Sequence, residues 1–248
     1  MFPIRDHNPS TRTPVVTYGL LGLNTLVFLF MWPLYGSHAA TDLFMSYGMI
    51  PARLSDGAGT LTLISSMFLH GGFMHFAGNM LFLWIFGDNL EDMLGHGRFL
   101  GFYLLAGILA ALAQFAGDPA SPVPIVGASG AIAGVMGGYL LLFPKARVDI
   151  LLIIVIIFKI VPVPAWLMLI LWFGLQLFNS AASFGGDAGG VAHLAHAGGF
   201  IAGFVMVLPL WRRLGGASFW DRTSGHPDHP EARYRLTRSN VPQVGRRK

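Results

Sequence analysis

Charged side chains are missing from six long stretches of this sequence, and each stretch is long enough to hold a membrane-spanning helix. The charge-free stretches are residues 13–41, 57–87, 99–117, 119–144, 160–186 and 188–211. About 20 apolar residues in a helix cross the hydrocarbon core of a bilayer, where one charged side chain costs roughly 2.5 to 3.5 kcal/mol. Only 11% of the residues are charged, whereas soluble domains carry about 25%. This pattern excludes a disordered chain and argues against a soluble globular domain.

The charge-free stretches predict an all-α, polytopic membrane protein with a bundle of six transmembrane helices. We expect these helices at residues 15–34, 74–93, 99–116, 129–143, 165–179 and 189–210. A further charge-free interval, 150–158, is apolar but too short to span a bilayer. Pro162 and Pro164 separate it from the next helix. The interval is consistent with an interfacial, a re-entrant or a strand-like connection that does not span the membrane.

Basic residues indicate that both ends of the chain lie in the cytoplasm. With a cytoplasmic N terminus, six spans leave Arg53 as the one lysine or arginine on the outer side, in agreement with the positive-inside rule. The chain then divides into a short cytoplasmic N-terminal segment (1–14), a membrane-embedded six-helix domain (15–211) and a cytoplasmic tail (212–248). The tail has nine basic and three acidic residues, and we expect it to be disordered and attracted to anionic lipids.

Four polar residues at membrane depth form the candidate site, because such residues are costly in lipid and usually serve a function. Ser129 opens the fourth predicted helix, and His196 lies at a similar depth in the sixth. His75 and Asn79 share one face of the second helix at i, i+4 spacing. Their combination predicts a polar site inside the membrane.

Glycines at four-residue spacing line the helices that carry Ser129 and His196. They are Gly130, Gly134 and Gly138 on the fourth helix and Gly199 and Gly203 on the sixth. Such spacing lets two helix backbones approach closely. Close approach would bring Ser129 within hydrogen-bond reach of His196, which is how a histidine activates a serine. His193, one turn outward, is an alternative base.

Each of these features also has a purely structural explanation. Glycine ridges are common packing motifs in membrane helices, Ser129 can be a helix N-cap, and His75 with Asn79 can form an interhelical hydrogen-bond pair. A serine at a glycine-flanked helix start together with a deep histidine favours chemistry over packing. The sequence has no cysteine, so a thiol nucleophile and a Cys-ligated metal are excluded.

Three motifs in residues 15–211 resemble those of the rhomboid family of intramembrane serine proteases. Gly127-Ala128-Ser129-Gly130 is similar to the family's GxSG, the segment from His75 to Asn79 to its HxxxN, and the segment from Ala195 to Gly203 to its AHxxGxxxG. The expected fold is therefore a six-transmembrane-helix rhomboid-like bundle.

The resemblance implies a Ser/His dyad without a carboxylate partner. Ser129 would be the nucleophile and His196 the general base, while His75, Asn79 and the backbone amide of Ser129 would stabilise the oxyanion. The resemblance also implies that residues 36–73 form a partly embedded outer loop and that residues 180–187 cap the cavity. The position four residues after the serine, often aromatic and stacked on the histidine in this family, is Ala133, so another group must hold His196.

These features predict a serine endopeptidase that hydrolyses a peptide bond in or near the outer end of a substrate's transmembrane segment. The expected partners are single-span membrane proteins and the lipid bilayer, in the plasma (inner) membrane. We expect no cofactor, metal ion or nucleic acid, and the sequence does not indicate an oligomeric state. Two alternatives are an inactive rhomboid-like protein that binds membrane clients and a small transporter. Against a transporter, the polar residues at membrane depth include no acidic or basic pair.

Overall fold

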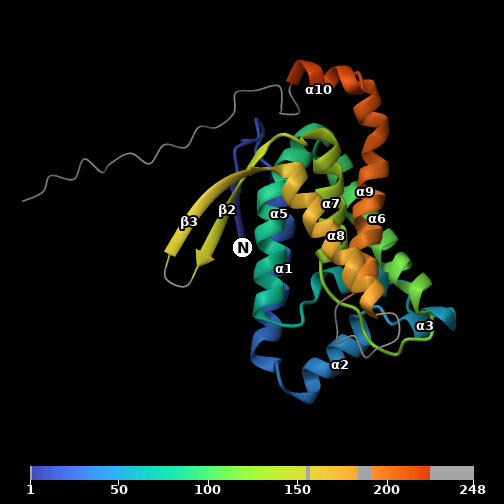
Figure 1. The fold of residues 1–248 in the computed structure, drawn as a ribbon. Coiled ribbons are helices and arrows are strands. Elements are labelled where there is room, and N and C mark those ends of the chain that lie inside the picture. The colour runs from blue at the N-terminus through green and yellow to red at the C-terminus, as the bar shows by residue number, and fades with distance from the viewer. Residues whose placement is uncertain (1, 155–156, 184–191, 224–248) are drawn as a thin grey trace, which may run out of the picture.

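The structure, a computed structural model, describes residues 2–154, 157–183 and 192–223, which are mostly helical. Long helices run up and down through a bundle (Figure 1). They are α1 (Val15–Met31), α5 (Phe73–Leu94), α6 (His96–Gly117), α7 (Ser129–Leu142), α8 (Ala165–Ser183) and α9 (His193–Arg213). Each overlaps one of the predicted helices, although α8 ends and α9 begins four residues later than expected.

Several of these helices have the length and composition of membrane spans. In the described part of the chain, three are long and apolar enough to cross a membrane: α6, α9 and Val15–Leu34, which adds the 3-10 turn Trp32–Leu34 to α1. The apolar helices Ser129–Leu142 and Ala165–Asn179 are shorter. Large apolar side chains such as Leu26, Phe30 and Phe178 are more than two-thirds exposed. So much outward apolar surface suits contact with lipid.

The segment 36–73, expected as an outer loop, folds into short helices at one end of the bundle (Figure 1). They are α2 (His38–Tyr47), α3 (Pro51–Ser55), α4 (Thr62–Ser65) and the 3-10 turn Ser66–Phe68. We call this end the loop end, and α5, α7 and α9 all begin there. Backbone hydrogen bonds between Met49 and Ile125 tie the segment to the stretch that leads into α7.

α7 is the central helix, and its small residues let its neighbours approach closely. All of its residues except Ser129 and Leu140 are buried. A Cβ added at Gly203 or Gly199 on α9 would collide with a backbone carbonyl oxygen of α7. On another side, a Cβ at Gly134 would lie 2.5 Å from the Cβ of Ala106 on α6. The close approach of α7 and α9 that the glycine spacing predicts is confirmed.

The expectation of an all-α chain is wrong, because a three-stranded antiparallel sheet lies beside the bundle (Figure 1). β1 (Phe2–Asp6) and β3 (Ile157–Pro164) both pair with the central strand β2 (Arg147–Ile154). The described residues of the interval, 150–154 and 157–158, are therefore in strands rather than in a helical re-entrant segment. Its β-branched residues favour extended backbone. Pro162 and Pro164 lie on an edge strand, where a missing N–H is tolerated.

The tail that we expected to be disordered from residue 212 begins with ordered structure. α9 runs on through Arg213, and α10 (Ala217–Thr223) follows it. The Trp220 Nε1–H donates a 2.9 Å hydrogen bond to the carbonyl oxygen of Leu141 on α7, and Phe219 is buried. These contacts attach α10 to the end of the bundle opposite the loop end, which we call the sheet end. The rest of the predicted tail, 224–248, lies outside the described residues.

Two aspartates, Asp149 and Asp6, attach the N-terminal segment to the sheet end. Burial opposes ionisation of Asp149, but hydrogen bonds from Arg5 at 2.7 Å and His7 at 2.8 Å lower its pKa. Asp6 accepts hydrogen bonds from the Tyr139 hydroxyl of α7 and from Asn89 of α5. Burial, together with the neighbouring Asp88, raises the pKa of Asp6 to about 8. Residues 2–14 are thus part of the folded protein.

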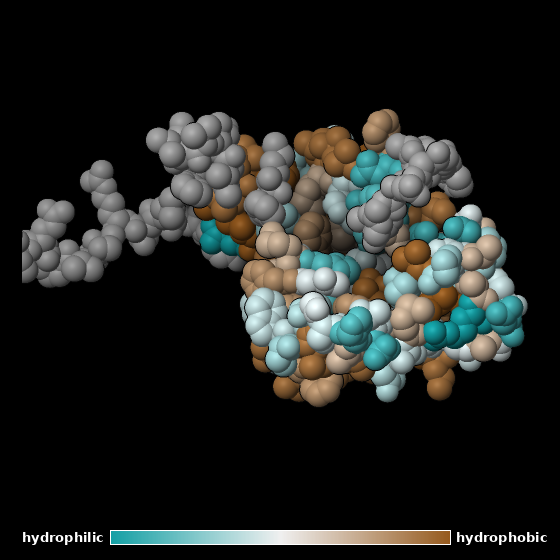
Figure 2. All heavy atoms as spheres, turned by 90° about the horizontal axis from the view of Figure 1, so that it is seen from below, coloured by the Kyte–Doolittle hydropathy of each residue, from teal (hydrophilic) through white to brown (hydrophobic). Residues whose placement is uncertain are grey.

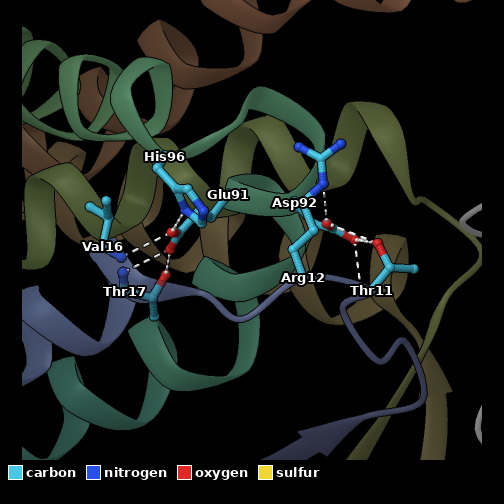
Figure 3. Close-up of polar contacts among 7 residues, drawn as sticks. All are labelled: Thr11, Arg12, Val16, Thr17, Glu91, Asp92 and His96. Carbon is cyan, nitrogen blue, oxygen red and sulfur yellow. Dashed lines mark hydrogen bonds and ion pairs between the residues drawn. The ribbon is translucent and has the colours of Figure 1, made fainter.

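Glu91 of α5 caps the first turn of α1 from outside that helix (Figure 3). The N-cap position of α1 is Pro14, which makes no side-chain cap bond. Glu91 instead accepts hydrogen bonds from the backbone N–H groups of Val16 at 2.9 Å and Thr17 at 2.7 Å, and it also bonds the Thr17 hydroxyl and His96. A carboxylate at a helix N-terminus is favoured by the helix dipole. Glu91 therefore fixes α1 against α5.

Replacing Glu91 by leucine should lower the free energy of unfolding by about 2 to 4 kcal/mol, because the partly buried N–H of Val16 and the buried N–H of Thr17 lose their acceptor. Thermal unfolding of the detergent-solubilised protein measures the change. The control is Arg12→Met, which removes an exposed ion pair with Asp92 at 3.9 Å and should cost less than about 1 kcal/mol. Equal stability of the two variants would contradict a capping role for Glu91.

Candidate functional site

Ser129 is the first residue of α7, and its side chain points to α9 rather than capping its own helix. The N-cap position is Ala128, which makes no side-chain cap bond, so the explanation of Ser129 as an N-cap is wrong. The Ser129 Oγ lies 2.7 Å from the His196 Nε2. Gly127 before it has φ +125°, a backbone conformation that residues with a Cβ rarely adopt. The structure thus brings together the two residues predicted as nucleophile and base.

The separation of Ser129 and His196 follows from the packing of their helices. Both residues lie in the first turn of their helices, where α7 and α9 are in backbone contact. The start of α9 is held from a third helix, because the Gln114 side chain on α6 accepts a 3.1 Å hydrogen bond from the backbone N–H of Ala195. This bond satisfies one of the free N–H groups of the first turn. Gln114 belongs to none of the predicted motifs.

α8 holds the imidazole of His196. The Nδ1 of His196 is 2.9 Å from the Gln176 Oε1, and the Trp172 ring packs against the imidazole, tilted by 36° with centroids 5.8 Å apart. Gln176 and Trp172 thus hold His196 in place, which Ala133 is too small to do by stacking on the histidine. His193, the alternative base, hydrogen-bonds Gln176 at 3.0 Å, whereas Ser129 pairs with His196. The geometry favours His196 over His193 as the base.

His75 and Asn79 lie on one face of α5 and both line the same cavity as Ser129. The backbone N–H of Gly71 donates to the His75 Nδ1 at 3.3 Å, which leaves the proton of a neutral imidazole on Nε2. A Cβ built at Gly127 would lie 2.6 Å from this Nε2 and 3.5 Å from the Ser129 Oγ. The Nε2–H of His75 therefore lies close to Gly127, next to the serine.

Asn79 has a buried amide group with donor capacity to spare. Its side chain is 7% exposed, and its Nδ2 has no hydrogen-bond partner among the described residues. A buried donor left unpaired costs about 1 to 3 kcal/mol, so such groups call for an explanation. A ligand oxygen in the cavity would supply the missing acceptor.

A cavity of about 1430 Å³ opens between the helices. It is lined by the four predicted site residues, Ser129, His196, His75 and Asn79. Trp172, Gln176 and Gly127 line it as well. Viewed from the loop end, the molecule is hollowed, with hydrophilic and hydrophobic residues around the hollow (Figure 2). The cavity is large enough for a segment of peptide chain and water. Residues 180–183, predicted as part of a cap, are the end of α8, and residues 184–187 lie outside the described residues.

His70 is a buried loop residue beside the site rather than a member of it. It is 1% exposed, and its ring packs against His75 and Phe76 with centroids 5.3 and 5.5 Å away. Burial, followed by the nearby His75, lowers the pKa of His70 to about 4, so the ring is neutral at neutral pH. His70 lies between the 3-10 turn Ser66–Phe68 and the start of α5 at Phe73.

Comparison with known proteins finds one family. A family model described as the Rhomboid domain matches residues 58–213. The rhomboid protease GluP of Bacillus subtilis (strain 168) is 38% identical over 127 residues, which are 51% of this chain and 24% of GluP. Rhomboid protein 1, mitochondrial, of Saccharomyces cerevisiae is 31% identical over 199 residues, which are 74% of this chain and 53% of the yeast protein.

A human protein is similar at lower identity. The human presenilin-associated rhomboid-like protein, mitochondrial, is 28% identical over 143 residues, which are 54% of this chain and 37% of the human protein. The matched region therefore spans a quarter to about half of the length of these three relatives.

Proposed function

This chain belongs to the rhomboid family, and on that premise we propose that it is a serine endopeptidase that cleaves membrane-protein substrates within the bilayer. It is an integral membrane protein. The observation that carries the proposal is the 2.7 Å contact between the Ser129 Oγ and the His196 Nε2, which faces a large cavity. A serine paired with a base in this way is an activated nucleophile.

In the proposed reaction, Ser129 and His196 share the proton transfers. The Ser129 Oγ attacks the carbonyl carbon of the scissile peptide bond while the His196 Nε2 accepts the hydroxyl proton. His196 then gives this proton to the leaving amine, and an acyl ester on Ser129 remains. His196 then takes a proton from a water molecule, which attacks the ester. The ester bond breaks, His196 returns the proton to the Ser129 Oγ, and the serine hydroxyl is regenerated.

The negative charge of the tetrahedral intermediate is stabilised by donors from α5 and α7. The backbone N–H of Ser129 lies at the start of α7, where N–H groups have no partner within the helix and the helix dipole is positive. The Nε2–H of His75 and the Nδ2 of Asn79 add two side-chain donors from the cavity wall. Donors that are held in place before the reaction stabilise the oxyanion without reorganisation.

Asn79→Ala is expected to lower kcat by about 10²- to 10³-fold with little change in KM, because a donor used mainly in the transition state is lost. Steady-state cleavage kinetics in proteoliposomes measure both constants. The matched control is Asn24→Ala, another buried asparagine, whose amide bonds the Leu20 carbonyl of its own helix. A wild-type kcat for Asn79→Ala would remove Asn79 from the oxyanion site.

In the proposed topology, the chain crosses the membrane six times, through α1, α5, α6, α7, α8 and α9. α7 has 14 residues, so it is about 21 Å long, which is shorter than a hydrocarbon core of about 30 Å. With its sheet end at the inner edge of the core, Ser129 lies roughly 10 Å below the outer edge. Both termini are then cytoplasmic, and the cleaved bond lies near the outer end of the substrate's helix.

The test uses purified protein in liposomes with a set of single-span membrane proteins as substrates. We expect the wild type to cleave at least one of them and Ser129→Ala to cleave none. A fluorophosphonate should label the wild type at Ser129. Cleavage that survives Ser129→Ala would overturn the serine mechanism. Absence of both cleavage and labelling in the wild type would favour a protein that binds clients without cutting them.

A further inference from the structure

The base of a Ser/His dyad must present the correct nitrogen to the serine. To accept the Ser129 proton, the His196 Nε2 must carry a lone pair, so that the proton of the neutral ring is on Nδ1. An acceptor at Nδ1 fixes this tautomer and the orientation of the ring, as the third member of a serine-protease triad does. Among the described residues, the Nδ1 of His196 has one hydrogen-bond partner, the Gln176 Oε1 at 2.9 Å.

Gln176 acts together with Trp172, one turn earlier on α8. The two residues are at i, i+4 spacing and so share one face of the helix. Trp172 packs on the imidazole at a ring-centroid distance of 5.8 Å and also on Phe200 of α9 at 6.2 Å. The ring of His196 is therefore restrained by packing against Trp172 and by the hydrogen bond to Gln176. In this chain α8 supplies the support that Ala133 on α7 does not.

His193 makes a second contact with the amide oxygen of Gln176. Its Nδ1 lies 3.0 Å from the same Oε1, and a carbonyl oxygen with two lone pairs accepts two N–H donors. With the amide reversed, its NH₂ group would donate to both Nδ1 atoms. His196 would then carry its proton on Nε2 and could not take the proton of Ser129. The arrangement with the oxygen toward both rings is the one compatible with base catalysis.

We propose that Gln176 is a positioning residue of the dyad, which accepts the Nδ1–H of His196 and holds the imidazole in the tautomer and orientation that deprotonate Ser129. The inference rests on the proposed proteolytic function and deepens it. Gln176 does not touch the reacting atoms, and its amide is neutral. It therefore orients the base through a carbonyl dipole, without the full negative charge that an aspartate would bring.

The test compares Gln176→Leu, which removes the acceptor, with Gln176→Glu, which keeps an acceptor oxygen at a similar place. Gln176→Leu should lower kcat by about 10- to 100-fold and leave KM within about two-fold. The rate of fluorophosphonate labelling of Ser129 should fall by the same factor, because labelling requires the activated serine but no substrate. Gln176→Glu should restore both rates to within a few-fold of wild type.

Leu175→Ala is the control, because Leu175 is the neighbouring residue of α8 and its side chain is 59% exposed. It should keep wild-type kcat, and thermal unfolding of each variant checks that the fold is intact. A wild-type kcat and labelling rate in Gln176→Leu would overturn the inference, as would a loss that Gln176→Glu does not restore. Ser129→Ala in the same assay separates the two proposals, since its activity would overturn the proteolytic mechanism itself.

Discussion

His196→Ala should lower kcat by about 10³-fold or more and should abolish fluorophosphonate labelling of Ser129. The serine hydroxyl is a weak nucleophile without a base, and positioned proton transfer accounts for about 10²- to 10⁴-fold of rate. The His196 Nε2 lies 2.7 Å from the Ser129 Oγ and is the base that we propose. Cleavage kinetics in proteoliposomes and the labelling rate of Ser129 are the two measurements.

Two other histidine variants make this prediction specific. His193→Ala leaves the Ser129 contact in place and loses a donor to Gln176, so its kcat should fall by no more than about ten-fold. His38 is exposed on α2, away from the cavity, and His38→Ala should cleave at the wild-type rate. If His193→Ala is inactive while His196→Ala still cleaves, the assignment of the base is wrong.

Gly203→Val should destabilise the protein by about 3 kcal/mol or more and remove activity with it. A Cβ at residue 203 would collide with the backbone carbonyl of Gly134, and a main chain cannot rotate aside as a side chain can. Overpacking costs about 1 to 3 kcal/mol and sometimes more, and separation of α7 from α9 would also part Ser129 from His196. Thermal unfolding and cleavage kinetics of the same preparation measure the two effects.

Gly22→Val is the matched control, because Gly22 is exposed on α1 and an added Cβ would meet no atom within 4 Å. The substitution changes the same pair of residue types in a helix without creating a collision. We expect its unfolding temperature to stay within a few degrees of wild type. Equal loss of stability in the two variants would show that the glycine contact between α7 and α9 is not what the fold depends on.

The helices could be predicted from the sequence because their signal is local. The position of a helix can be estimated directly from the charge-free stretch that contains it. α5 and α7 begin and end within one residue of the predicted positions. The sheet could not, because the apolar run in 150–158 is compatible with a strand or a buried helix. Its partner β1 is separated from it by about 140 residues of chain, and no local pattern reveals such a pairing.

The candidate site divides in the same way. Ser129, His196, His75 and Asn79 stand out because each is polar in an apolar helix and lies in a recognisable spacing. Gln176 is also a polar residue in an apolar helix, so the same signal was present, but it belongs to no motif. Its meaning depends on how α8 is rotated and shifted against α9, and this arrangement is fixed by packing between helices that the sequence does not specify directly.

α8 carries apolar side chains that point outward and also the two side chains that hold the ring of His196. Its outward side chains Leu171, Leu175 and Phe178 are 60%, 59% and 70% exposed, while Trp172 and Gln176 reach His196. Helices respond to bilayer thickness by tilting. A tilt of α8 would displace Trp172 and Gln176 and so turn the imidazole, while the backbone contact between α7 and α9 would keep the two reacting atoms near each other. The length of the surrounding acyl chains is therefore expected to set the turnover number, with the fold unchanged.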